Sequence, residues 1–259
     1  LKRYVTLQKE RKKETRRSRG SCERLHNKTM RARMAYISSL FLASRNAMAL
    51  RAPCVLATAS RPISSLLFAT KEEVDPGKVE GTDLQIVKYP HPSLRAENAE
   101  ITQEELDEGS ISKIAKEMFL IMYAAEGVGL AAPQVGINKR LMVYNASGDP
   151  KKWLDEVTMV NPKIVEFSDA TDIETEGCLS FPEMNGDVER SKWIKVEALN
   201  LKGKKLKKKF KGWEARIFQH EYDHLDGKVY IDHLSEEGRS EVQPVLDDLV
   251  GAYGEGGAL

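Results

Sequence analysis

The heptapeptide FQHEYDH, residues 218–224, contains two histidines four positions apart, with a glutamate directly after the first. On an α-helix the side chains of His220 and His224 lie one turn apart on the same face, so both imidazoles can bind one metal ion. This is the H-E-x-x-H pattern, in which the glutamate, here Glu221, accepts and returns a proton beside the ion. Because short motifs also arise by chance, a charged helix with two unrelated histidines is the alternative.

Two imidazoles leave a tetrahedral ion short of protein ligands, so a third donor is needed. Cys178 in the segment EGCLSFP is one candidate, although a lone cysteine is more often a small buried apolar residue. The longer metzincin pattern fails, because it requires a third histidine where this chain has Tyr230. A glutamate after the motif is another option, and the chain offers Glu236, Glu237 and Glu241.

A third segment, GVGLAAPQVG at residues 127–136, is rich in glycine and carries no charge. On its own it indicates only a loop that needs positive φ angles. In their order along the chain, however, the three segments resemble the signatures G-x-G-L-A-A-x-Q, E-G-C-L-S and Q-H-E-x-D-H of the peptide deformylase family. The resemblance covers residues 84–234, including YPHPSLR at residues 89–95, and is to the organellar, plant-type members.

The resemblance implies that Cys178, His220 and His224 bind one divalent metal ion and that Glu221 is the general acid and base. It favours Fe²⁺, and a thiolate with two imidazoles also suits Zn²⁺.

The resemblance further implies that the side chain of Gln134 and the backbone N–H of Leu179 polarise the formyl oxygen of the substrate. The substrate backbone is expected along three residues of the glycine-rich segment: Gly127, Val128 and Gly129. Arg190 matches a recurrent arginine downstream of the cysteine motif, and we expect it to pair with Asp223 in support of the ligands. Asn185 stands where many bacterial members carry another polar or basic residue, so the resemblance leaves its part in holding the substrate undefined.

The resemblance therefore implies a metal-dependent hydrolase that removes the formyl group from the N-terminal formyl-methionine of nascent polypeptides and releases formate. Water at neutral pH is a poor nucleophile, and a bound metal ion lowers its pKa from about 15.7 to about 7. At about 1.4 kcal/mol per pKa unit, this stabilisation is on the order of 12 kcal/mol.

Two alternatives to a deformylase remain. An H-E-x-x-H metallopeptidase would cleave peptides that carry no formyl group, and a structural Cys/His metal module would need a fourth protein ligand.

Hydrophobic periodicity predicts the elements that must position these residues. Apolar residues at helical spacing predict a helix over residues 111–122 that stops at Gly127, and RLMVYNA and MVNPKIVEF have the composition of strands. The segment WIKVEALNLKGKKLKKKFKG alternates and turns at Gly203, as a hairpin does. Residues 213–225 are the motif helix, closed by Gly227. A last helix is expected from residue 235, with Pro244 either near its first turn or breaking it.

Strands followed by a late helix predict an α+β fold, in which antiparallel and mixed β-sheets pack around the central helix that carries the H-E-x-x-H motif. We expect one catalytic domain over residues 80–252. The glycine-rich end, residues 253–259, is expected to be a flexible tail.

Residues 1–79 have a different composition from the rest of the chain. Between Arg24 and Lys71 there is no Asp or Glu, while Arg, Ser, Ala and Leu abound, as in organelle transit peptides. The apolar patches there are too short to span a membrane. We expect a basic, disordered transit peptide and linker, with translation starting at Met30 or Met34, and a location in the chloroplast stroma or the mitochondrial matrix. A basic tail that attaches to nucleic acid is the alternative.

Charge and cysteine content limit the expected partners. The net charge of +1 gives no global reason to expect nucleic acid, and the lysine run at residues 202–211 is most simply a solvated face, with a ribosome contact as the alternative. We expect formyl-methionine nascent peptides as the partner, the organellar ribosome as a further candidate, and neither direct nucleic-acid binding nor a membrane. The sequence leaves the oligomeric state open. Cys178 is the only cysteine after residue 79, which indicates a reducing compartment.

Overall fold

The computed structural model describes residues 76–259, so the transit-like segment up to residue 75 lies outside the described residues. Two β-sheets form the framework of the described part, and all of their strand pairs are antiparallel. The five-stranded sheet has the order β1-β2-β3-β6-β7, with β1 (Gly129–Ala131), β2 (Leu141–Tyr144), β3 (Val157–Phe167), β6 (Trp193–Leu199) and β7 (Lys205–Lys211). The second sheet is the hairpin of β4 (Thr171–Cys178) and β5 (Phe181–Ser191). A parallel pairing occurs as an isolated bridge between Ala99 and Lys139.

Within the described residues, four α-helices accompany the sheets: α2 (Gln103–Asp107), α3 (Ser110–Ala124), α4 (Trp213–Leu225) and α5 (Glu236–Tyr253). Short 3₁₀ helices lie at η1 (Pro92–Leu94), η2 (Ala132–Val135), η3 (Pro150–Asp155) and η4 (Tyr230–His233). None of the helices within residues 76–259 is long and apolar enough to cross a membrane. Helices and antiparallel sheets in one unit confirm the α+β class.

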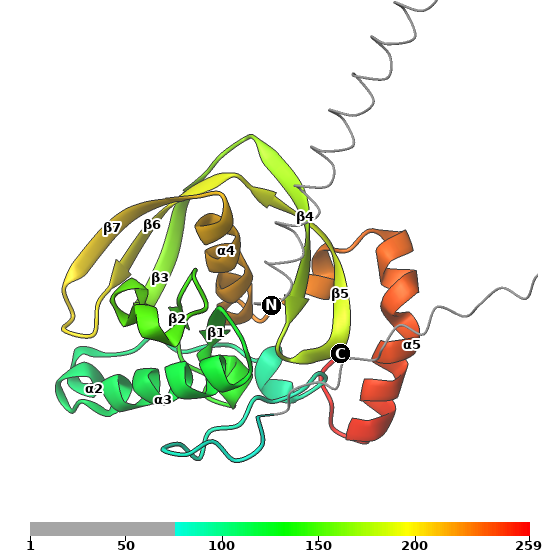
Figure 1. The fold of residues 1–259 in the computed structure, drawn as a ribbon, viewed down its shortest axis with the longest axis horizontal. Helices are drawn as coiled ribbons and strands as arrows, with labels where there is room; N and C mark the ends of the chain where they lie inside the picture. The colour runs from blue at the N-terminus through cyan, green and yellow to red at the C-terminus, as the bar shows by residue number, and fades with distance from the viewer. Residues whose placement is uncertain (1–75) are drawn as a thin grey trace, which may run out of the picture. The chain divides into compact units, whose positions relative to one another are not determined.

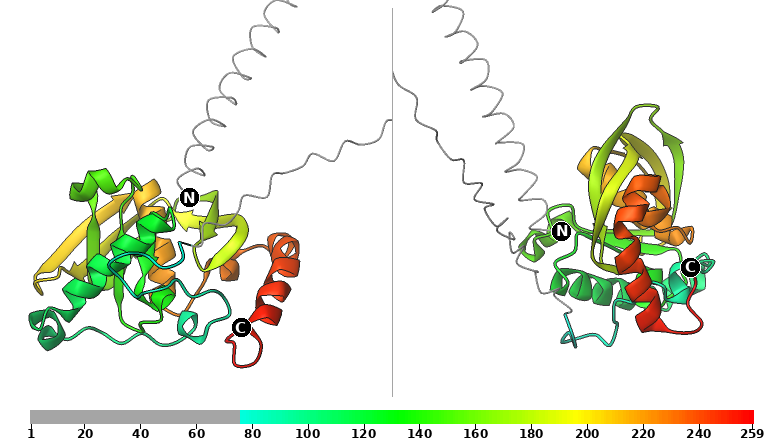
Figure 2. Two further views of the ribbon diagram at one scale, coloured as in Figure 1. Left: turned by 60° about the horizontal axis from the view of Figure 1, so that its bottom comes forward. Right: turned by 90° about the vertical axis from the view of Figure 1, so that its right-hand side faces the viewer.

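Helix α4 occupies the centre, between the five-stranded sheet and the β4–β5 hairpin, and α5 packs on the outer side of β5 (Figure 1, Figure 2). Helix α3 covers the other face of β1 and β2. Because side chains alternate across a strand, Leu141 and Val143 join the core under α3, whereas Met142 and Tyr144 join the core under α4. The central helix is therefore enclosed on several sides, and four of its polar residues, Arg216, Gln219, Glu221 and His224, are buried with it.

The bounds of α4 agree with the sequence prediction, and both ends follow from glycine. Gly212 precedes the helix at φ 55°. At the other end Gly227 has φ 67°, its N–H donates to the carbonyl of His224 at 3.3 Å, and the N–H of Lys228 donates to the carbonyl of Asp223 at 2.9 Å. This is the Schellman arrangement, which places the last turn of α4, and with it His224, in a fixed position.

The β6–β7 hairpin also forms where the sequence predicted it. Gly203 turns the chain at φ 71°, and the side-chain oxygen of Asn200 accepts from the N–H groups of Lys202 and Lys204. The inward residues of the hairpin, Ile194, Val196 and Phe210 among them, pack in the core with α4.

The expectation for Pro244 was wrong. This proline lies inside α5, which continues through it from Glu236 to Tyr253. A proline removes one backbone hydrogen bond and crowds the preceding turn. Val242 and Leu246 on either side of it are buried in a cluster with Phe181 and Val188, and this packing holds the helix together across the proline. Beyond α5, the backbone N–H of Ala258 donates to the carbonyl of Pro90 at 2.8 Å.

Candidate metal centre

Cys178, His220 and His224 come together between the two sheets. Cys178 is the last residue of β4, and the two histidines project from α4. One ligand atom from each residue lies within 4.8 Å of the others, and the Cys178 Sγ lies 3.3 Å from Nε2 of His224. Among the residues that the structure describes, Cys178, His220 and His224 form the one group of potential metal ligands whose ligand atoms lie this close together. The three residues named from the sequence therefore meet in space.

The electrostatics of the cluster favour the ligand form of the cysteine. Burial alone would raise the pKa of the Cys178 thiol, but the neighbouring His224 and His220 lower it, to about 5. A thiolate rather than a thiol is the form that binds metal ions. The sulfur is thus charged at neutral pH.

Glu221 lies beside these ligand atoms, and one oxygen of its carboxylate is not hydrogen-bonded elsewhere among the described residues. It is 4% exposed, and its Oε2 has no hydrogen-bond partner among the described residues. Burial raises its pKa to about 7, against the lowering effect of His220 and His224. Buried polar atoms are nearly always paired, so an unpaired carboxylate oxygen next to a thiolate and two imidazoles fits a site that takes up an ion and water. Three protein donors also leave a tetrahedral ion one open position.

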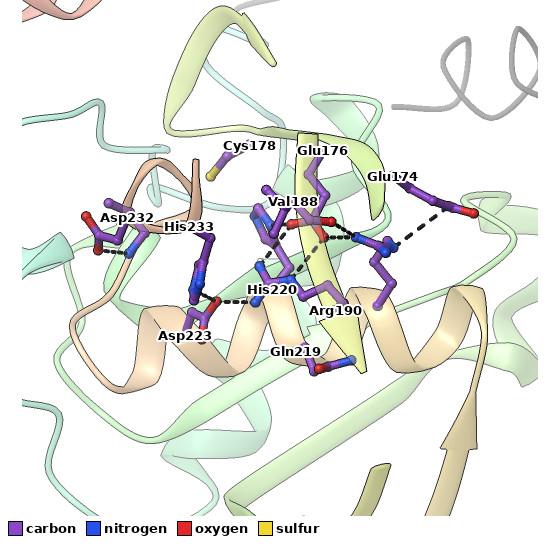
Figure 3. Close-up of polar contacts among 12 residues, drawn as sticks. Glu174, Glu176, Cys178, Val188, Arg190, Gln219, His220, Asp223, Asp232 and His233 are labelled. Atoms are coloured by element: carbon purple, nitrogen blue, oxygen red, sulfur yellow. Dashed lines mark hydrogen bonds and ion pairs between the residues drawn. The ribbon is translucent and has the colours of Figure 1, made fainter. Parts of the chain in front are cut away.

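Glu176 holds one of the two histidines from behind (Figure 3). Its Oε2 accepts from Nδ1 of His220 at 3.0 Å and from Arg190 at 2.9 Å, and its Oε1 accepts from Arg190 at 3.0 Å and from Arg216 at 2.7 Å. Burial alone would raise the pKa of Glu176, but His220 and Arg190 hold it well below the ordinary range. The carboxylate is therefore ionised, and the second nitrogen of His220, Nε2, is left for the ligand cluster.

The expected pair between Arg190 and Asp223 is present, with the guanidinium 2.5 Å from the carboxylate. Asp223 also contacts Nε2 of His233 at 2.9 Å (Figure 3). A chain of polar contacts thus runs from the partly exposed His233 through Asp223 and Arg190 to Glu176.

Gln134 belongs to η2, and its amide group points at the cluster. Its Oε1 accepts from the N–H of Ala131 at 2.8 Å, which fixes the orientation of the amide. Its Nε2 lies 3.4 Å from the Cys178 sulfur and 3.5 Å from the Ser180 hydroxyl. Leu179 follows Cys178 in the turn between β4 and β5, and its carbonyl accepts from the Lys88 ammonium at 3.1 Å.

Of the three glycine-rich residues named from the sequence, Gly129 begins strand β1, an edge of the five-stranded sheet, and Gly127 and Val128 directly precede it. The N–H of Gly127 donates to the carbonyl of Met122, and the carbonyl of Val128 accepts from Asn145. Gly129 lies opposite Tyr144 of β2 and directly under the Glu221 carboxylate. Asn185 lies exposed on β5, opposite Gly177.

Sequence reasoning missed Glu176, Arg216 and His233 as parts of this centre. The first two carried a usable signal. Glu176 stands two residues before Cys178 on a strand, and Arg216 stands four residues before His220 on a helix, so each shares a face with a ligand. His233 is brought to Asp223 by η4, after the Gly227 turn, and has no such spacing signal.

A buried thiolate, two imidazoles from an H-E-x-x-H helix and an adjoining free carboxylate define the class of this site: the centre of a metal-dependent hydrolase. A family model described as polypeptide deformylase matches residues 83–240. The chain belongs to the polypeptide deformylase family, whose members are metal-dependent hydrolases.

Individual relatives agree with this assignment. Peptide deformylase 1B, chloroplastic/mitochondrial, from Arabidopsis thaliana is 39% identical over 174 residues, which are 67% of this chain and 62%, less than two thirds, of that protein. Peptide deformylase 1B, chloroplastic, from Solanum lycopersicum is 37% identical over 209 residues, covering 76% of this chain and 74% of that protein. The crystal structure of peptide deformylase from Plasmodium falciparum matches with a TM-score of 0.63 at 41% identity, over 65% of this chain and 96% of the other.

Proposed function

We propose that this chain hydrolyses the formyl amide at the N-terminal formyl-methionine of newly made polypeptides and releases formate. The observation that carries the proposal is the position of Glu221, a buried carboxylate with an unpaired oxygen and a pKa of about 7 beside the thiolate and imidazoles of the cluster. A group with a pKa near the working pH both accepts and returns a proton efficiently. The chemistry of the formyl amide needs both transfers.

We propose Cys178, His220 and His224 as the ligands of one divalent cation, with Fe²⁺ as the native ion and Zn²⁺ as a functional substitute. One sulfur and two nitrogen donors suit either ion. When bound, such an ion lowers the pKa of water and polarises a carbonyl oxygen. Glu176, by accepting from Nδ1 of His220, fixes the tautomer that presents Nε2 to the ion.

In this proposal Glu221 takes a proton from the attacking water and gives it to the leaving amine of methionine. The amide Nε2 of Gln134 and the backbone N–H of Leu179 donate to the oxygen of the formyl group as negative charge develops on it. The orientation of Gln134 by the Ala131 N–H supports this role, because a donor that is already aimed needs no rearrangement during the reaction. Loss of one such donor typically lowers the rate by about a hundredfold or more.

The proposed substrate lies along the β1 edge, at residues 127–129. An edge strand can accept an extended peptide by backbone hydrogen bonds. In this position the N-terminal end of the peptide would lie next to Glu221, since the carboxylate sits over Gly129. The formyl group on the N-terminal nitrogen of the substrate is small. A tight site around it would exclude the larger acetyl group.

We further propose an organellar location, the chloroplast stroma or the mitochondrial matrix, where translation would supply formyl-methionine. The names of the plant relatives and the composition of residues 1–79 support it. In this proposal residues 1–79 are the transit peptide and linker, residues 80–252 are the catalytic domain, and the ribosome is the source of the nascent peptide.

The test is formate release by the full chain, purified without oxygen and loaded with Fe²⁺, from a formyl-methionine peptide. The matched acetyl-methionine peptide and the same peptide with a free N-terminus are the comparison substrates. We expect formate from the formyl peptide alone, and a rate lower by about a hundredfold or more for Glu221→Ala. Cleavage of internal bonds in the free peptide would instead indicate a metallopeptidase. Metal-loaded protein that releases no formate would overturn the proposal.

A further inference from the structure

We propose that Arg216 is a positioning residue for His220 and acts on it through the carboxylate of Glu176. The proposal rests on the assignment of His220 as a metal ligand. It concerns an arginine that lies on α4 one turn before this histidine and makes no contact with the ligand cluster in the described structure.

The acceptor capacity of Glu176 is the first argument. A carboxylate has about four acceptor positions, two on each oxygen. Arg190 fills one on each oxygen, Arg216 fills the second on Oε1, and Nδ1 of His220 fills the second on Oε2. With both arginines bound, Glu176 has one acceptor position left, on Oε2, and Nδ1 of His220 donates to it in a single ring orientation. Without Arg216, Oε1 keeps only its donor from Arg190, and the carboxylate loses one of the two guanidinium groups that restrain the last torsion of the glutamate, which by itself has a broad minimum.

The anchoring of Arg216 itself is the second argument. Its Nη1 donates to the carbonyl of Val188 at 2.9 Å as well as to Glu176, and its Nη2 donates to the carbonyl and the carboxylate of Asp172 at 2.9 Å and 2.8 Å. The residue is 4% exposed. Its guanidinium therefore joins both strands of the β4–β5 hairpin to the helix that carries His220. A lysine in its place has a single ammonium and cannot reproduce this planar fork.

The position of Glu176 makes this anchoring relevant to the ion. Glu176 lies on β4, two residues before Cys178, so the same strand provides one ligand and the carboxylate that orients another. Arg216 and Arg190 hold that carboxylate from the α4 side and from the β5 side, respectively. Through Glu176, Arg216 thereby helps to set the distance between the sulfur of Cys178 and Nε2 of His220. Groups that orient a metal-bound histidine typically change metal affinity by 10- to 100-fold when they are removed.

The test measures Co²⁺ binding by the full chain after its ion has been removed with a chelator. Binding of Co²⁺ to a thiolate and imidazoles gives visible absorption, so the titration reports the ligand geometry as well as the affinity. The variants are Arg216→Met, which keeps the length without the charge, and Arg216→Lys, which keeps the charge without the fork. Arg95→Met is the matched control, because Arg95 makes a two-bonded pair with Asp232 outside the cluster.

We expect Co²⁺ affinity to fall about 10- to 100-fold in Arg216→Met, with a changed absorption spectrum, and to fall about tenfold in Arg216→Lys. Arg95→Met should lose thermal stability but keep the wild-type affinity and spectrum. Folded Arg216→Met with wild-type affinity would overturn the proposal, and if that variant does not fold, wild-type affinity in Arg216→Lys would overturn it. Because no substrate is present, this outcome is separate from whether the chain releases formate.

Discussion

The carboxylate of Glu221 on α4 lies against the Cα of Gly129 on β1. A Cβ added at residue 129 would come within 2.3 Å of Oε1 and 2.8 Å of the carboxylate carbon. The glycine is therefore required by this close approach and not by its own backbone angles, since its φ is not in the positive range. The glycine of the β1 edge and the acid of the H-E-x-x-H helix are in close contact, so the strand limits the position of the proposed proton carrier.

The substitution Gly129→Ala should displace the Glu221 carboxylate and slow the reaction. A misplacement of about 1 Å in a catalytic group can cost about a hundredfold in rate. We expect a loss of this size in kcat/KM for formate release from a formyl-methionine peptide, with the metal content unchanged. Gly251→Ala is the control, because a Cβ there meets nothing within 4 Å. Equal rates in the two variants would show that Glu221 is free to move aside.

Replacement of Gln134 should affect kcat more than KM. If its Nε2 donates to the formyl oxygen mainly as charge develops, Gln134→Leu loses an interaction of the transition state and not of the ground state. We expect kcat to fall about a hundredfold while KM changes little. Steady-state kinetics on the formyl peptide make the distinction. A raised KM with an unchanged kcat would assign Gln134 to substrate binding alone.

The pairing of His220 with His224 and the helix that carries them could be predicted because both depend on local patterns, whereas Cys178 on β4 was expected only from the family resemblance. The four-residue spacing of His220 and His224, and Gly227 beyond the last turn, are properties of one helix. Local spacing places Glu176 and Arg216 on the same faces as Cys178 and His220, but it does not reveal the contacts of Glu176 with Arg216 and His220. Glu176 meets Arg216 and His220 across 40 and 44 residues of sequence, and these contacts exist only after the β4–β5 hairpin has packed on α4.

Pro244 illustrates the opposite limit of local rules. Its ring disfavours the interior of a helix in any context, and the sequence therefore indicated a helix start or a break. The burial of Val242 and Leu246 against β5 and η4 outweighs the local penalty, and this burial depends on the tertiary structure.

The pair between Asp232 and Arg95 should make stability depend on pH in acid. Burial by itself raises the pKa of Asp232, but the Arg95 guanidinium and the Val229 N–H hold it below the ordinary value. A lowered pKa in the folded state means that the stabilisation is present above the unfolded pKa of about 3.9 and is lost as the pH falls through the folded value.

Asp232→Asn should therefore lower the free energy of unfolding at pH 7 by about 1 kcal/mol, since the pair is partly exposed. The difference from wild type should shrink below pH 4, in urea titrations at pH 7, 5, 4 and 3. A difference that stays constant over this range would mean that the charge of Asp232 contributes nothing and that packing alone accounts for the loss.

Addition of a metal ion should raise the thermal stability of the metal-free protein by an amount that depends on ion concentration. The three proposed ligands come from β4 and α4, so they converge only in the folded chain, and an ion that binds there stabilises the folded state. At a free concentration 100 times Kd, this stabilisation is about 2.7 kcal/mol. The core cluster around α3 contains none of the proposed ligands, so the metal-free chain should remain folded. We expect Tm to rise steadily with added Zn²⁺ in the wild-type protein and to stay nearly constant in Cys178→Ala, which retains both histidines but lacks the thiolate. An equal rise in the two proteins would place the ion somewhere other than at Cys178.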